Sequence, residues 1–198
     1  MAVSVEDIKK LKELTGVGLG DAKSALVEAD GDFDKALEAM RKKGLTKAEK
    51  KGDRETREGL IESYVHSNRI GVVVEVNCET DFVARLPEFK EFAHQIAMQI
   101  AAMSPKYPTM EDVPADEMDA KKQELLASDS LKGKPTDMAE KIVDGQLKKH
   151  FAEQVLMEQA YIMDDSKTVG QFVKEQVAKS GENIRISQFK RIELGVTE

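Results

Sequence analysis

Apolar residues recur at helical spacing at the start of the chain. Val5, Ile8, Leu11 and Leu14 are three residues apart, and the preceding Ser4 begins a capping-box-like pattern. Two further groups with the same period follow, separated by glycines that end helices. They consist of Leu19, Ala22, Ala25, Leu26 and Ala29, and then of Phe33, Ala36, Leu37 and Met40. Residues 1–44 are therefore predicted to form a compact three-helix unit.

The pattern changes after this unit. Residues 41–57 are rich in Lys and Arg and poor in large apolar side chains. Such a run is typical of a nucleic-acid surface or of a solvated linker. Interleaved acids and the absence of aromatic residues favour the linker, which we assign to residues 45–57.

Strand-like patterns begin after Gly59. Leu60–His66 and Ile70–Val76 flank Ser67-Asn68-Arg69, an arrangement that predicts an antiparallel hairpin. Near the end of the chain, Ile184–Leu194 alternates and then changes register near Gln188, which predicts a third strand with a bulge. We expect this strand to join the hairpin, because the pattern predicts no other strand for it.

The segments between these strands are predicted to be helical. Phe89–Ala101 is amphipathic and expected to cover one face of the sheet, whereas Ser104–Pro114 carries three prolines and is expected to be a loop. Ala115–Ala127 has the composition of a surface helix. A longer helix is expected from Asp137 to Leu156, and another from Thr168 to Ser180. Residues 58–198 are therefore predicted to form an α+β domain.

Asn77–Arg85 connects the second predicted strand to a helix that begins near Pro87. Thr80 or Asp81 is placed to cap a helix through a side-chain oxygen. Phe82 has two interpretations. It either folds into the core, as a single Phe usually does, or stands beside Asp81 as a rigid apolar wedge offered to a partner.

Composition restricts the classes of function. The chain has 198 residues, a formal net charge of -7 and a single cysteine, Cys78. An acidic chain is a poor general binder of nucleic acid. The absence of a disulfide pair, of a leader and of a long apolar run predicts a protein of the reducing cytoplasm that does not insert into a membrane. Cys78 ends an apolar strand and is expected to be a small buried hydrophobe rather than a nucleophile.

No catalytic or cofactor pattern is evident. His66, His94 and His150 lie on separate predicted elements and lack the spacing of metal ligands. Asp81 is a single carboxylate without an evident titratable partner. Thr15–Gly20 is glycine-rich but lacks the Lys-Ser/Thr ending of a phosphate loop. A binding protein without a cofactor or metal is therefore expected, rather than an enzyme.

Three motifs carry a resemblance to a known family. Leu14–Lys23, Asn77–Arg85 and Ser180–Ile186 resemble, in order and over almost the whole chain, the motifs of bacterial elongation factor Ts. The resemblance implies a ubiquitin-associated-like module at the N-terminus. It also implies guanine-nucleotide exchange on elongation factor Tu, which the factor binds in the GDP-bound and nucleotide-free forms.

The resemblance also implies roles for particular residues. Thr80, Asp81, Phe82 and Val83 would enter elongation factor Tu near its Mg²⁺ and phosphate site. Within this segment we assign the wedge role to Phe82, because aromatic residues dominate interface energetics, and expect Asp81 to repel or reorient charged groups near the metal.

A second set of residues is expected to support the contact. Val83 and Ala84 would seat the turn, and Leu19 and Gly20 match two apolar positions of the N-terminal module. Gly20 departs from the larger side chain that is common there, so the contact is expected to be smaller. Val17 is an alternative contact residue, and the sequence does not decide between Val17 and Leu19.

The chain is short for this family, and the short members that it resembles form homodimers. We therefore expect a homodimer whose interface is formed by the sheet or by the late helices, which are those predicted towards the C-terminal end of the chain. Two other functions stay open. One is a peptide-binding scaffold built on the N-terminal module, and the other is an RNA-binding protein that uses residues 41–57, against which the acidic composition argues.

Overall fold

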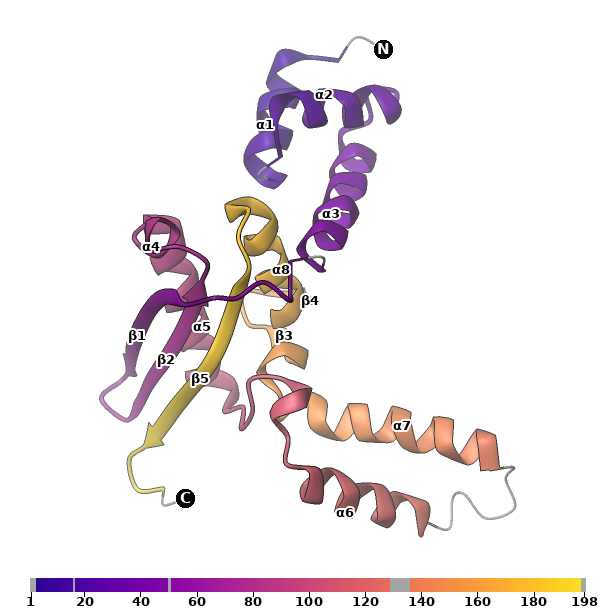
Figure 1. Cartoon of the computed structure of the whole chain (residues 1–198), viewed down its shortest axis with the longest axis vertical. Helices are drawn as coiled ribbons and strands as arrows, with labels where there is room; N and C mark the ends of the chain where they lie inside the picture. The colour runs from indigo at the N-terminus through magenta and orange to yellow at the C-terminus, as the bar shows by residue number, and fades with distance from the viewer. Residues whose placement is uncertain (1–2, 16, 50, 129–135, 197–198) are drawn as a thin grey trace.

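The structure is a computed structural model that describes residues 3–15, 17–49, 51–128 and 136–196. Figure 1 shows a helical module at the N-terminal end, a small sheet with its helices in the middle, and a pair of helices that extends away from them. The predicted α+β class is confirmed. Among the described residues, no helix combines the length and apolar character that crossing a bilayer requires.

The N-terminal module consists of α1 (Val5–Thr15), α2 (Leu19–Glu28) and α3 (Phe33–Glu49). The Ser4 hydroxyl accepts a hydrogen bond from the Asp7 N–H at 2.9 Å, so the predicted cap is present. Small residues allow the three helices to approach closely. Their shared core contains Leu11, Ala22, Ala25, Leu26, Ala36 and Met40. The specific likeness to a ubiquitin-associated module stays a prediction.

The boundary between module and linker differs from the prediction. Helix α3 does not end before Gly44 but continues to Glu49, through residues assigned to the linker. At Gly44, α3 meets α8 (Val169–Ser180), and a Cβ atom on Gly44 would lie 3.3 Å from the Cβ of Ala178. Gly44 therefore permits close helix packing there, and this tertiary contact outweighs the low helix propensity of glycine.

The central sheet has the order β1-β2-β5 within the described residues, with both neighbouring pairs antiparallel. Its strands are β1 (Glu58–His66), β2 (Ile70–Cys78) and β5 (Ile184–Glu193). The predicted hairpin and the return of the last strand to it are confirmed. Gln188 pairs with Glu75 and Ile186 with Val76, so Ser187 is the extra residue of a bulge, one position before the predicted place.

The two faces of the sheet differ. On one face Val72, Val74 and Val76 are buried against α5 (Pro87–Met103), and α8 completes that core beside β5. The start of α5 at Pro87 and its covering role agree with the prediction. On the other face, apolar side chains stay exposed on all the strands. They are Ile61, Val65, Val73 and Ile192.

A helical pair, α6 (Ala115–Leu126) and α7 (Thr136–Ala152), projects from the sheet and its helices (Figure 1). The surface position predicted for residues 115–127 is confirmed, since α6 has no buried residue. The short 3₁₀ turn η1 (Met110–Asp112) precedes it. The pair has a core of its own, made of Val113, Val143, Leu147, Phe151 and Val155.

The predicted extent of α7 was wrong at its end. The helix stops at Ala152, and Val155 instead forms a parallel bridge with Tyr107. The backbone N–H groups of Lys106 and Tyr107 donate to the Gln154 carbonyl. The residues after Ala152 therefore form hydrogen bonds with the proline-rich loop instead of continuing the helix. Helix α7 begins one residue before the predicted cap Asp137, whose side chain lies outside the described residues.

A second, two-stranded sheet was not predicted; in the described part of the chain it consists of β3 (Ala160–Tyr161) and β4 (Asp164–Thr168). It follows the 3₁₀ turn η3 (Leu156–Glu158) and leads into α8. The buried Gln99 side chain provides hydrogen-bond partners for the backbone of this small sheet. It donates to the Ala160 carbonyl at 3.1 Å and accepts from the Ile162 N–H at 2.9 Å.

Candidate functional site

The connection between β2 and α5 contains a single helical turn, α4 (Asp81–Ala84). Thr80 caps it, since its hydroxyl accepts a hydrogen bond from the Val83 N–H at 3.4 Å. Of the two predicted caps, Thr80 is therefore the one used. Asp81 is left at the first position of the turn with its side chain exposed.

The turn presents one side to solvent and the other to the core. Phe82 exposes 74% of its surface, whereas Val83 exposes 5% and Ala84 is also buried. Val83 and Ala84 join the core that includes Phe89 and Ile184. Phe82 is therefore not a core residue, and the alternative of an outward-facing side chain holds.

Asp81 makes an ion pair with Arg85 one turn later, with 2.8 Å between the carboxylate and the guanidinium. Both side chains are largely exposed, so this pair contributes little to stability and is easily exchanged for another partner. Among the described residues, no group of three or more His, Cys, Asp or Glu side chains has the arrangement of a metal site. The turn thus presents one carboxylate and one aromatic ring rather than a metal centre.

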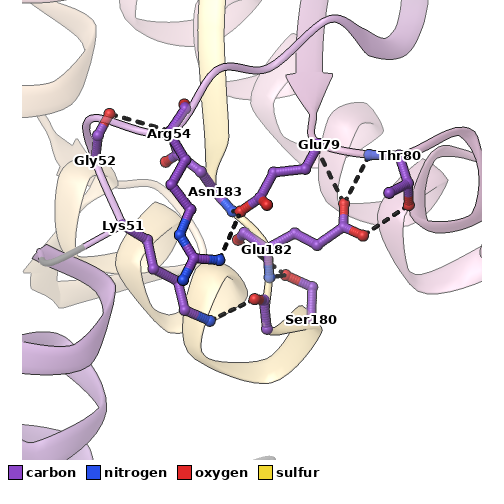
Figure 2. A network of polar contacts seen from close by, with 9 residues as sticks. Lys51, Gly52, Arg54, Glu79, Thr80, Ser180, Glu182 and Asn183 are labelled. Carbon is purple, nitrogen blue, oxygen red and sulfur yellow. Dashed lines mark hydrogen bonds and ion pairs between the residues drawn. The ribbon is translucent and has the colours of Figure 1, made fainter.

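The backbone before the turn is held by residues from the end of the chain (Figure 2). The Glu182 carboxylate accepts hydrogen bonds from the Glu79 N–H at 3.1 Å and the Thr80 N–H at 3.0 Å, and from the Thr80 hydroxyl at 2.6 Å. In return, the Glu79 carboxylate accepts from the Asn183 N–H at 2.6 Å. The predicted motifs around residues 80 and 182 are thus brought into direct contact.

The same polar cluster reaches the segment that leaves the N-terminal module. The Asn183 side-chain amide donates to the carbonyls of Gly52 at 3.1 Å and Arg54 at 2.7 Å. Lys51 donates to the Gly181 carbonyl, and the Arg54 guanidinium lies 3.4 Å from the Glu79 carboxylate. The sequence did not predict that Glu182 and Asn183 would hold the turn and the segment after the module, although both residues lie in the Ser180–Ile186 motif.

The other predicted contact residues lie on the module, away from this turn along the chain. Leu19, at the start of α2, exposes 52% of its surface, and Gly20 beside it is exposed, with open space around the position of a Cβ. Val17 instead packs against the core of the module. Leu19 and Gly20 are therefore available to a partner, while Val17 is partly covered. Gly16 lies outside the described residues.

Cys78 has the environment expected for a structural thiol. It is fully buried, and its thiol donates to the Thr80 carbonyl at 3.1 Å. Burial, together with the nearby negative charge of Glu182, raises the pKa of the Cys78 thiol to about 11. A thiol that stays protonated is a poor nucleophile.

The three histidines lie on separate elements, as predicted, although the rings of His66 and His94 both pack against Tyr64. His94 is 3.1 Å from the Glu62 carboxylate, and His66 is 2.9 Å from the Tyr64 hydroxyl. His150 is on α7 and packs edge-on against Phe151. None of these contacts combines a nucleophile with a base that an oriented third group supports.

The sequence was also compared with known proteins. Residues 7–196 match the family model described as Elongation factor TS. The chain is 53% identical to elongation factor Ts of Thermotoga maritima over 196 residues, which cover 98% of both chains. It is 49% identical to elongation factor Ts of Fervidobacterium nodosum over 98% of this chain and 100% of that one.

A third relative is elongation factor Ts of Desulfosudis oleivorans, which is 50% identical over 194 residues and 98% of both chains. The family model and these relatives all extend across the module, the turn at residues 80–84 and the end of the chain. The likeness therefore covers the whole architecture rather than one motif. This protein belongs to the elongation factor Ts family, whose name places it in translation elongation.

Proposed function

We propose that this protein is a guanine-nucleotide exchange factor that binds GDP-loaded elongation factor Tu, disturbs its Mg²⁺ and phosphate site and promotes release of GDP. The observation that carries the proposal is the exposed Phe82 beside Asp81, on a turn anchored by a buried neighbour. The family to which the chain belongs supplies the identity of the partner.

Exchange of this kind follows from linkage between two binding equilibria. A factor that binds nucleotide-free elongation factor Tu more tightly than the GDP form weakens GDP binding by the same ratio. The factor itself needs no nucleotide site and makes or breaks no covalent bond. This fits a chain whose predicted partner residues are an aromatic ring, a carboxylate and small apolar groups.

The Thr80–Val83 turn has the parts that such a task requires. Phe82 offers a rigid apolar surface, and aromatic residues dominate the energetics of interfaces. Asp81 places a negative charge beside Phe82. In the complex this charge would lie near the Mg²⁺ of elongation factor Tu, and Mg²⁺ requires near-ideal octahedral geometry. Small shifts of the metal's ligands then loosen both Mg²⁺ and GDP. Thr80 shapes the turn as its cap, and the buried Val83 and Ala84 seat it.

The N-terminal module supplies a second contact in this proposal. Leu19 is its exposed apolar residue, whereas Gly20 beside it is exposed but adds no apolar side chain, so the contact is small. Val17 supports the loop from inside. Two separated contacts on one partner bind more tightly than either alone, because the second forms within the complex.

We further propose that the protein acts as a homodimer through the open face of its sheet. Four large apolar side chains are exposed on that face, among polar neighbours such as Ser63 and Lys190, and they supply the apolar contacts of the proposed interface. They are Ile61, Val65, Val73 and Ile192. A second copy would cover them and provide additional surface to the partner. We expect this dimer to work in the cytoplasm, where translation elongation takes place, without binding membrane or nucleic acid directly.

Release of a fluorescent GDP from elongation factor Tu of matched source tests the exchange function. The label is displaced by excess unlabelled GDP, with and without substoichiometric amounts of this protein. Turnover is expected, with each molecule accelerating release from many partner molecules. Unchanged release at all concentrations would remove the exchange function and favour the peptide-binding scaffold.

A further inference from the structure

The turn that carries Asp81 and Phe82 is too short to hold its own shape. Helix α4 contains four residues, Asp81–Ala84, and isolated helices of that length are unstable. Its cap is also long, with 3.4 Å between the Val83 nitrogen and the Thr80 hydroxyl oxygen. Something outside the turn must therefore fix its direction.

Glu182 contacts the turn at the required place. One carboxylate oxygen accepts from two successive backbone N–H groups, those of Glu79 and Thr80, and the other accepts from the Thr80 hydroxyl at 2.6 Å. Figure 2 shows this carboxylate facing the backbone between β2 and α4. Hydrogen bonds to a charged acceptor are the stronger kind, and three of them fix both the backbone and the cap.

Glu182 is itself held in place. Gly181 adopts a φ of 78° after α8, a backbone conformation that favours glycine and turns the chain toward the sheet. The Glu182 N–H then donates to the Ser180 hydroxyl at 3.2 Å. The next residue, Asn183, binds both the Glu79 carboxylate and the segment at residues 52–54.

We propose that Glu182 is a positioning residue for nucleotide exchange, which fixes the turn in the orientation in which Asp81 and Phe82 meet the partner. This inference rests on the proposed exchange function. Glu182 acts through Thr80 and need not touch the partner. The same polar cluster ties the turn to residues 51–54, which follow the module, so the two contact regions are held at a constant separation.

Three substitutions separate the parts of this role. Glu182→Ala removes all three hydrogen bonds. Glu182→Asp keeps the charge but is one methylene shorter. Glu182→Gln keeps the length, and its carbonyl oxygen can accept from both N–H groups while its amide donates to the Thr80 hydroxyl oxygen. If position matters more than charge, Glu182→Gln is the variant that retains function.

The first measurement is the GDP-release rate as a function of factor concentration. We expect Glu182→Ala and Glu182→Asp to lower the maximal rate roughly 10- to 100-fold, since small misplacements of working groups have effects of that size. Glu182→Gln should stay within about threefold of wild type on the same grounds. The half-saturating concentration should change much less, because Leu19 and the module still bind. Glu158→Gln, on an exposed side chain far along the chain from the turn, is the matched control.

The second measurement does not depend on exchange. Deuterium uptake of a peptide covering residues 78–86 should rise in Glu182→Ala and Glu182→Asp, with amide exchange at Thr80 roughly tenfold faster, as expected for a lost hydrogen bond. Uptake elsewhere and the urea-unfolding midpoint show whether the variants are otherwise folded.

The outcomes separate this inference from the proposed function. No acceleration by wild-type protein removes the proposed function and, with it, the role of Glu182 in exchange. If wild type accelerates release and the three variants do the same, the inference alone is wrong. A fall in maximal rate without increased uptake at residues 78–86 would also overturn it, because the turn would then be unchanged.

Discussion

Phe82 and Val83 are consecutive residues of α4 whose side chains have opposite environments. The ring of Phe82 faces solvent, and the isopropyl group of Val83 is buried in the core with Phe89 and Ile184. One residue therefore anchors the turn, and the other is displayed by it. Substitution of the two should separate stability from exchange.

Phe82→Ala is expected to leave the free energy of unfolding within about 0.5 kcal/mol of wild type, because the side chain is exposed. The acceleration of GDP release should fall by at least about tenfold, as for loss of a hot-spot aromatic residue. Val83→Ala should instead cost about 2 kcal/mol of stability, through lost burial and the cavity left behind. Urea melts and GDP-release assays on both variants check this.

Leu126→Ala is the control, since Leu126 is an exposed apolar residue on α6, outside the proposed contact. It should alter neither quantity. Wild-type exchange by a stable Phe82→Ala protein would exclude the wedge role.

The module contact predicts effects of opposite sign at neighbouring positions. Leu19→Ala removes exposed apolar surface and should raise the concentration of factor that gives half-maximal GDP release by roughly three- to tenfold. Gly20→Met adds such surface where a Cβ meets nothing, so it should lower that concentration. The maximal release rate should be nearly constant in both, because the turn at residues 80–84 is unchanged.

Titrating the factor against labelled elongation factor Tu measures both parameters. Val27→Ala, an exposed apolar position on the same helix α2, serves as the control and should change neither. Equal effects at Leu19 and Val27 would point to general weakening of the module rather than to a specific contact.

Sequence periodicity predicted the parts of the fold that have long regular patterns. The hairpin of β1 and β2 appears as two strand-like runs of apolar and β-branched residues around Ser67-Asn68-Arg69, and the bulge at Ser187 appears as a slip in the alternation of β5. Periodicity fails where tertiary contacts decide. Helix α3 continues through Gly44 because α8 packs closely there. Strand β4 was not predicted, because Asp164–Thr168 contains no apolar residue.

The site was predictable in composition but not in orientation. A single helical turn is too short for its apolar spacing to tell which side faces the core, so Phe82 had two interpretations and the structure decided between them. The contact of Glu182 with Glu79 and Thr80 was beyond sequence reasoning, because it joins residues 103 and 102 positions apart through main-chain donors. Main-chain donors leave no signature in side-chain pattern.

Burial of Cys78 predicts a pH dependence of stability. The folded protein keeps the thiol protonated up to a pKa of about 11, whereas in the unfolded chain a thiol ionises near pH ~8.5. As the pH rises through this interval, the unfolded chain loses the proton first and is stabilised by doing so. Stability attributable to the neutral thiol is therefore complete below about pH 8.5 and lost progressively toward pH 11.

Cys78→Ala is the reference that lacks this titration. The difference in unfolding free energy between wild type and Cys78→Ala should shrink from pH 8 to pH 11, while other titrations cancel between the two proteins. A difference that stays constant over this range would contradict a protected thiol. Slow reaction of the native thiol with a disulfide reagent at pH 8, and fast reaction in urea, provide an independent check.

The open face of the sheet predicts how the protein associates. Ile192 exposes 73% of its surface on β5, and its strand partner Gly71 on β2 leaves that side chain uncovered. Ile192→Glu places a charge on the face without disturbing the buried core, so the monomer should keep its unfolding free energy within about 0.5 kcal/mol. Burial of this charge in a dimer interface is unfavourable, so the dimer should dissociate.

Sedimentation velocity at micromolar concentration distinguishes the two states by mass. Wild type is expected to sediment as a dimer and Ile192→Glu as a monomer, while Leu126→Glu on the projecting helical pair should stay dimeric. Because the second copy would add surface to the partner contact, the monomeric variant should also exchange GDP more slowly at equal chain concentration. A wild-type protein of monomeric mass would exclude the dimer, and a dimeric Ile192→Glu would move the interface away from the sheet to the late helices.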